Sequence, residues 1–62
     1  MKLYVAPMDA VVVEVDRDGR VKLENEDWST PTLQERRAII YAAQNEIAEL
    51  DELIQALESP LH

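Results

Sequence analysis

The side chains in this sequence that could do chemistry are mostly carboxylates, and their richest run lies in the C-terminal third. From Ala38 onward there are five acids and no lysine or arginine, the acids being Glu46, Glu49, Asp51, Glu52 and Glu58. Paired carboxylates such as Glu49 and Glu52 act as acid and base only where a pocket shifts their pKa values. Sixty-two residues leave little room for such a pocket. We therefore expect no enzyme and no catalytic residue.

A second group of oxygen ligands has the alternation of a calcium-binding loop. Glu14, Asp16 and Asp18 are spaced two apart, and a glycine stands at the sixth position. The twelfth position, however, is Asn25 instead of the bidentate glutamate, and Arg20 and Lys22 put positive charge where further ligands of the ion should be. A hairpin turn explains the same residues, so we expect no metal site and no cofactor.

Composition narrows the class of protein further. The chain has no cysteine, and its one histidine, His62, cannot by itself form a zinc site or a catalytic triad. A net charge of −7 disfavours phosphates and anionic lipids as partners and favours basic protein surfaces. Apolar runs such as residues 10–13 are far too short to cross a membrane, and no signal-peptide core is present. We expect a cytoplasmic protein that binds neither nucleic acid directly nor membranes.

Residues 10–25 have the pattern of a β-hairpin. A two-residue loop at Asp18-Gly19 would mix charged and apolar side chains on both faces. A three-residue loop, Arg17 to Gly19 with the glycine in the left-handed conformation, keeps each face uniform. This register makes two apolar pairs and two acid–base pairs: Val15 with Val21, Val13 with Leu23, Asp16 with Arg20, and Glu14 with Lys22.

The rest of the chain completes a single α+β domain. Residues 2–6 alternate, with Leu3 and Val5 on one side, and Pro7 to Asp9 can form a turn into the hairpin. The expected fold is a small N-terminal antiparallel β-hairpin or three-stranded meander followed by one long amphipathic helix. The expected boundaries are 2–25 for the sheet, 26–30 for a connection, 31–58 for the helix and 59–62 for a tail.

Two signals compete for the start of the helix. Thr30 can cap it with Pro31 at the first helical position, or Thr32 can cap it with Glu35 closing a capping box. Ser59-Pro60 is expected to end the helix, because the residue before a proline is pushed out of the helical region. Trp28, just before the helix, is expected to cover the open end of the small core.

The helix is too long for the sheet. About 28 helical residues span roughly 42 Å, whereas short strands reach about 17 to 20 Å. Its apolar residues recur with the heptad spacing of a coiled-coil seam, with Ile39 and Leu53 on one flank. We expect one edge to pack on Val13, Val15, Val21 and Leu23 and the other to form a dimer interface, which comprises Leu33, Arg36, Ile40, Ala43, Ile47, Leu50, Ile54 and Leu57.

Charge suggests the direction of the second helix. Arg36 and Arg37 are the only basic residues from Pro31 onward. In a parallel dimer the seam position Arg36 would face its own copy. An antiparallel pair sets both arginines against the acidic end of the partner. We therefore expect a homodimer with antiparallel helices.

The acidic half of the helix is the candidate surface for another protein. Acids near a helix C-terminus oppose the macrodipole, so helix stability does not account for them, although a solvated face kept acidic for solubility is the simpler explanation. Tyr41 lies outside the seam and is expected to be an exposed contact residue. The expected partner-binding residues are Tyr41, Glu46, Glu49, Asp51 and Glu52.

The format of the chain is that of many small phage or mobile-element proteins. The leading hypothesis is an acidic homodimer that occupies a host or defence protein and inhibits or redirects it, as a nucleic-acid mimic. One alternative is a structural accessory subunit that docks into a larger complex. Another is a regulatory partner of a DNA-binding or toxin protein. Direct DNA binding is disfavoured, because the six basic residues are scattered and outnumbered.

Overall fold

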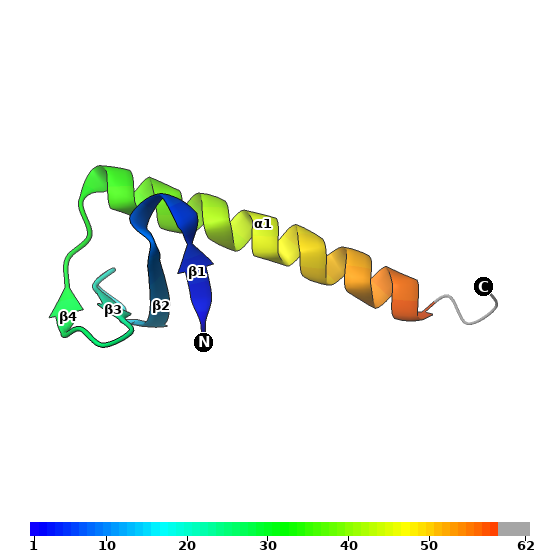
Figure 1. The fold of residues 1–62 in the computed structure, drawn as a ribbon, viewed down its shortest axis with the longest axis horizontal. Coiled ribbons are helices and arrows are strands. Elements are labelled where there is room, and N and C mark those ends of the chain that lie inside the picture. The colour runs from blue at the N-terminus through cyan, green and yellow to red at the C-terminus, as the bar shows by residue number, and fades with distance from the viewer. Residues whose placement is uncertain (59–62) are drawn as a thin grey trace.

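The chain forms a four-stranded antiparallel meander followed by one long helix (Figure 1). The computed structural model describes residues 1–58. The predicted stop at Ser59-Pro60, the tail 59–62 and His62 therefore lie outside the described residues. In order, the elements are β1 (Leu3–Val5), the 3₁₀ turn η1 (Ala6–Met8), β2 (Ala10–Val15), β3 (Val21–Leu23), β4 (Trp28–Ser29) and α1 (Leu33–Glu58).

The predicted α+β class is confirmed, but the sheet has one strand more than expected. β4 lies within the segment that was expected to be a plain connection, and it pairs with β3 through Lys22 and Trp28. The turn before it is tight because Asn25 adopts a left-handed conformation (φ 68°), which asparagine tolerates better than most residues. The Glu26 N–H also donates to the Leu23 carbonyl at 3.1 Å. This edge position leaves Trp28 38% exposed rather than covering the core.

The β2–β3 hairpin has the predicted turn but a different register beyond it. Val15 pairs with Val21 and Glu14 with Lys22, as expected, and Gly19 is left-handed (φ 84°). A β-bulge then intervenes, so Leu23 lies opposite Val12 and the predicted Val13–Leu23 pair is wrong.

The bulge has a physical reason in the position of β2 between two strands. Against β1, Val12 lies opposite Leu3 on the face toward the helix. Against β3, Val15 lies opposite Val21 on that same face. Positions 12 and 15 are an odd number apart, so simple alternation cannot turn both inward, and one extra residue restores the phase.

The hairpin turn is fastened by one carboxylate. Asp16 Oδ1 accepts the backbone N–H groups of Asp18 and Arg20, both at 2.9 Å, and Oδ2 accepts the Arg20 Nε–H at 2.7 Å. Desolvation alone would raise the pKa of Asp16. The hydrogen bonds from Arg20 and Asp18 and the arginine charge outweigh that effect, so the pKa lies below its ordinary value.

The helix begins with the second of the two predicted caps. The Glu35 N–H donates to Thr32 Oγ1 at 3.1 Å, and the Thr32 N–H donates to Glu35 Oε1 at 2.8 Å. This reciprocal pair is a capping box. Pro31 precedes it and is buried.

The core is small and lies under only the first part of the helix. Its buried residues are Leu3, Val5, Val12, Val21 and Leu23. The helix adds Ala38, Ile39, Ala42 and Ala43, which are partly buried against it, and runs beside β1 and η1. Val12 thus takes the core position that was predicted for Val13.

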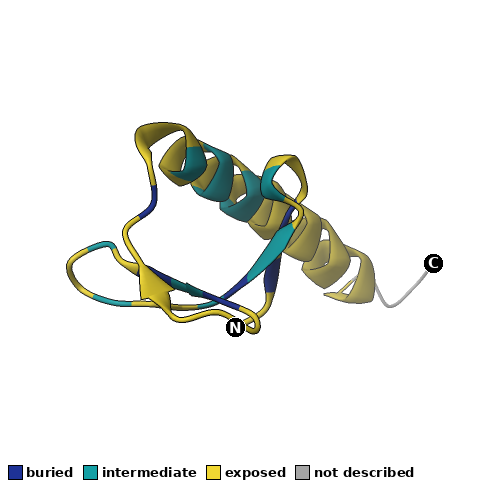
Figure 2. Ribbon diagram, turned by 60° about the vertical axis from the view of Figure 1, so that its left-hand side comes forward, coloured by how far each residue is buried: buried dark blue, intermediate teal, exposed yellow. Residues whose placement is uncertain are grey.

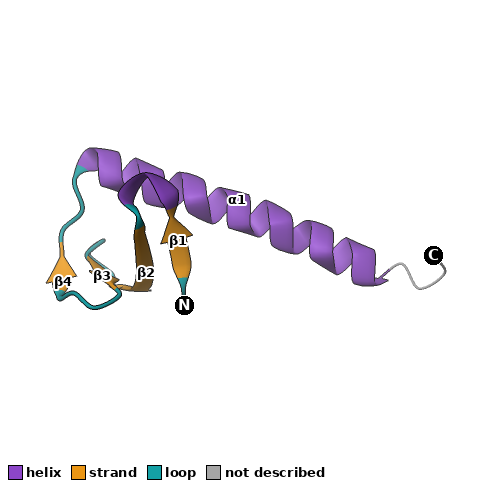
Figure 3. Cartoon of the chain, in the orientation of Figure 1, coloured by secondary structure: helices purple, strands orange, loops and turns teal. Residues whose placement is uncertain are grey.

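From residue 44 to residue 58 every helical position is exposed (Figure 2), and the helix extends well past the sheet (Figure 3). We call residues 44–58 the overhang. The predicted mismatch in length is therefore observed. In the part of the chain that the structure describes, no helix is both long and apolar enough to cross a membrane.

Candidate protein-binding site

Three of the five predicted partner-binding residues lie around one groove. Tyr41, Glu46 and Glu49 line an open depression of about 400 Å³ beside the place where η1 passes the helix. The sheet side contributes Tyr4, Ala6 and Pro7, and the helix also contributes Ala38, Ala42 and Asn45. We call this depression the tyrosine groove. No lysine, arginine or histidine lines it within the described residues.

The tyrosine groove exists because β1 is an edge strand. Leu3 and Val5 are buried toward the helix, so the intervening Tyr4 is directed out of the core and remains 56% exposed. The Tyr4 hydroxyl donates to Asp9 Oδ1 at 3.0 Å. That hydrogen bond, the negative charge of Asp9 and some desolvation raise the pKa of Tyr4. The raised pKa favours the protonated hydroxyl, which is the form that donates to Asp9.

The other two predicted partner-binding residues lie elsewhere on the helix. Successive helical residues are turned by about 100°, so Asp51 points about 160° away from Glu49. Asp51 Oδ2 also accepts a hydrogen bond from Gln55 Nε2 at 3.0 Å. Glu52 lies on the same side as Glu49 but one turn beyond the groove. The five residues thus form no single face.

The predicted dimer residues are divided between two environments. Ala43 is partly buried against the sheet. The Arg36 guanidinium reaches the hairpin turn, where Nη2 lies 3.5 Å from the position that a Cβ on Gly19 would occupy. The others, together with Leu53, are between 48% (Leu50) and 76% (Leu57) exposed. We call these exposed residues the apolar stripe: Leu33, Ile40, Ile47, Leu50, Leu53, Ile54 and Leu57.

A second depression, almost purely apolar, lies beside the covered part of the helix. It has a volume of about 240 Å³ and opens between the hairpin and the helix, where the sheet is not covered. Its lining residues are Val15, Gly19, Val21, Pro31, Arg36, Ile39 and Ile40. We call it the apolar groove. Ile40 belongs both to this groove and to the apolar stripe, so the two surfaces are continuous.

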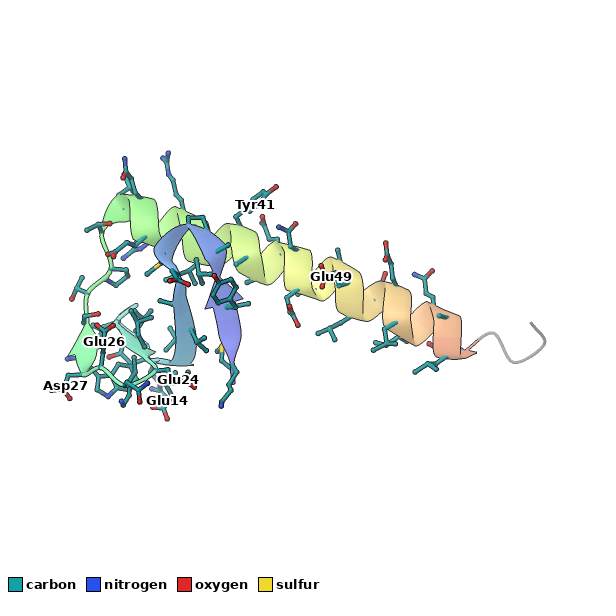
Figure 4. All side chains as sticks on the ribbon, in the orientation of Figure 1. Glu14, Glu24, Glu26, Asp27, Tyr41 and Glu49 are labelled. Atoms are coloured by element: carbon teal, nitrogen blue, oxygen red, sulfur yellow. The ribbon has the colours of Figure 1, made fainter. Side chains whose placement is uncertain are left out.

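The sequence alone did not single out the acids at the far end of the sheet. Figure 4 shows Glu14, Glu24, Glu26 and Asp27 gathered there, away from Tyr41 and Glu49 on the helix. Two lysines partly balance this charge. Lys2 Nζ lies 3.3 Å from Glu24 Oε2, and Lys22 Nζ donates to the Glu26 carbonyl at 2.8 Å. The acidic run after β3 was the signal available in the sequence, but only the fold brings Glu14 beside it.

Nothing in this arrangement is a cluster of metal ligands: within residues 1–58, no three histidine, cysteine or acidic side chains are placed to hold an ion. Comparison with known proteins adds no further constraint. No protein-family model matches the chain, and no curated protein or solved structure matches it either. What the site can bind therefore follows from its own residues.

Proposed function

We propose that this chain is a small acidic homodimer that binds a basic surface of another protein and thereby inhibits or redirects that protein. The observation that carries the proposal is the tyrosine groove, which combines aromatic and carboxylate side chains and has no cation in its lining. The overhang next to it carries acids and no lysine or arginine. A basic segment that follows the groove onto this side of the overhang therefore meets Glu46, Glu49 and Glu52.

The lining of the groove suits arginine or lysine side chains in particular. Tyr4 and Tyr41 offer exposed ring surface, on which a cation is worth about 0.5–1 kcal/mol at an exposed site. Glu46 and Glu49 are one helical turn apart and can accept charge-assisted hydrogen bonds from the same ligand. These carboxylates would stand where the target protein otherwise binds nucleic-acid phosphates.

The homodimer is supported by the exposure of the apolar stripe. Full burial of a leucine or isoleucine side chain contributes about 1.5–3 kcal/mol. The five stripe residues of the overhang are about half exposed or more, so covering them yields on the order of 10 kcal/mol for two chains. Association costs about 4–15 kcal/mol. The stripe alone therefore only balances that cost, and a stable dimer needs additional apolar surface.

The function is tested with a labelled twelve-residue peptide of alternating glycine and arginine, followed by fluorescence anisotropy. The native chain should bind it, and binding should weaken as salt rises, because exposed charges are screened beyond about 8 Å at physiological ionic strength. The double variant Glu46→Gln/Glu49→Gln should bind at least about tenfold more weakly, a loss of about 1.4 kcal/mol.

The matched control is Glu26→Gln/Asp27→Asn, which removes the same charge from the far end of the sheet (Figure 4). It should leave peptide binding nearly unchanged. Equal losses in both double variants would mean that only net charge matters and would contradict the groove as the site. No binding by the native chain would favour the accessory-subunit alternative.

A further inference from the structure

The apolar groove and the apolar stripe together make one surface that a single chain leaves uncovered. The stripe continues from Ile40 along the overhang, where Ile47, Leu50 and Ile54 are each about half exposed or more. The groove carries it onto the sheet, where Val15 is 46% exposed although it lies opposite the buried Val21. A helix laid along α1 on this flank would cover both at once.

We infer that the apolar groove is the seat of the overhang of a second copy, which runs antiparallel to α1 with the twofold axis near Asn45. This inference rests on the proposed homodimer and specifies how it is built. Each chain would fill the groove of the other. Each sheet core, which is incomplete between hairpin and helix, is thereby closed by residues of the partner.

The spacing of the seam residues supports this register. An antiparallel coiled coil packs one seam position against the other position of the facing heptad. With the axis near Asn45, every apolar seam residue except Ile54 meets an apolar one, and Ile54 lies level with Arg36. The resulting pairs are Leu33 with Leu57, Ile40 with Leu50, Ala43 with Ile47, and Arg36 with Ile54. The Arg36 guanidinium reaches the Gly19 turn, and an arginine whose charged end is held in this way can present its aliphatic stem to an apolar neighbour.

Charge complementarity supports the same register. Arg37 comes level with the partner's Asp51 to within about one helical turn, and Arg36 lies similarly near the partner's Glu58. These two arginines are the only basic residues of the helix. The acids that oppose the macrodipole at the end of each helix then lie beside the positive N-terminal end of the other helix.

The tyrosine groove is left free by this arrangement. Its helical residues are centred on the flank that Asn45 and Glu49 occupy, roughly 160° around the helix from the seam, and Glu46 lies nearest to the seam at about 80°. A dimer of this kind thus presents two tyrosine grooves, one on each chain. Dimer formation and binding of a basic peptide are therefore separately measurable.

The register is tested by disulfide trapping, since the native chain has no cysteine. Ile40→Cys and Leu50→Cys chains are mixed and oxidised. The mixed disulfide should predominate, because each cysteine lies about 15 Å along the axis from its own copy and a disulfide needs Cα atoms about 4.4–6.8 Å apart. Efficient self-linking of both variants would indicate parallel helices and overturn the inference.

The seating in the groove is tested by Val15→Asn, with Val11→Asn as the matched control. Both residues lie in β2, but Val11 lies opposite Tyr4, on the other face of the sheet from the groove. Val15→Asn should raise the dimer dissociation constant by about tenfold or more, whereas Val11→Asn should leave it nearly unchanged. Circular dichroism of both variants checks that the fold is retained.

The outcomes separate this inference from the proposed function. A mixed disulfide combined with no effect of Val15→Asn overturns the seat in the groove and leaves an antiparallel homodimer. A mass of 7.1 kDa by light scattering at micromolar concentration overturns the homodimer and with it this inference. Peptide binding by such a monomer would still support the tyrosine groove.

Discussion

The two parts of α1 differ in what covers them, although their sequences are similarly amphipathic. Residues 33–43 pack on the sheet mainly through small side chains, Ala38, Ala42 and Ala43, with Ile39 as the one large apolar residue. The overhang carries larger ones, among them Leu50 and Ile54, and none is covered. Small residues let the helix approach the sheet closely, whereas large exposed ones at seam spacing are typical of a helix that meets another helix.

This difference shows that the overhang lacks the stabilising apolar contacts that residues 33–43 make with the sheet. Within residues 1–58 the largest fully buried side chains are those of Val5 and Val12, which is little for a domain of this length. Small chains of this kind often gain stability by oligomerisation. The bare overhang therefore supports the proposal that a second copy covers it.

The largest effect is expected from Ile47→Asp, which places a charge in the middle of the stripe. Ile47 is 66% exposed in one chain, so the monomer should lose little stability. In the dimer the aspartate would be buried without a partner, twice, at a cost of about 3–5 kcal/mol for each site. The dimer dissociation constant should rise by more than about 100-fold, as measured by light scattering across a dilution series.

Tyr41→Ala is the control for this substitution. Tyr41 is as exposed as Ile47 but lies on the other flank, so its loss should leave the dimer intact. A native-like dimer in Ile47→Asp would contradict the distinction between the covered and uncovered parts of the helix. Dissociation of the dimer by Tyr41→Ala would mean that the interface lies on the flank of Tyr41 and not along the apolar stripe.

A medium effect is expected at the start of the covered part. Thr32→Ala removes one hydrogen bond of the capping box, and loss of such a cap costs about 0.5–2 kcal/mol. Thr30→Ala, which alters the competing cap, should change the free energy of unfolding by less than about 0.5 kcal/mol. Urea denaturation at one chain concentration measures both. A larger effect of Thr30→Ala than of Thr32→Ala would mean that the helix begins at Thr30 in solution.

Features set by neighbouring residues could be predicted from the sequence, and features set by distant ones could not. The Gly19 turn and the excess length of the helix follow from short-range chemistry, which also gave the Thr32–Glu35 cap as one of two candidates. The bulge at Val13 could not be predicted, because it depends on β2 pairing with two strands at once. β4 was missed because a two-residue edge strand leaves almost no pattern.

The candidate site divides in the same way. The exposure of Tyr41 follows from its place outside the heptad seam, and the acids of the overhang are plain in the sequence. That Tyr4 joins Tyr41 and Glu49 in one groove depends on the path of η1 beside the helix, which no local pattern specifies. Helical geometry separates Asp51 from the other acids, and a list of charges does not show this.

The smallest effect on stability is expected from Asp16→Asn. This effect should depend on pH, which identifies the charge of Asp16 as its cause. Asp16 belongs to the hairpin turn that the Arg36 guanidinium reaches from the helix. It therefore contributes to the packing of the covered part of the helix, residues 33–43, and not to the overhang. Its pKa is lowered in the folded chain. A carboxylate of this kind stabilises the fold above its unfolded-state pKa, and that stabilisation is lost as the pH falls through the folded-state value.

The native chain should therefore melt at a higher temperature than Asp16→Asn at pH 7, and the difference should shrink as the pH falls below about 4. Asp18→Asn is the control, because Asp18 contributes only its backbone N–H to this network. It should show no such convergence. A difference between the native chain and Asp16→Asn that stays constant from pH 7 to pH 3 would mean that the Asp16 charge does not fasten the turn, since an uncharged carboxyl group would then serve as well.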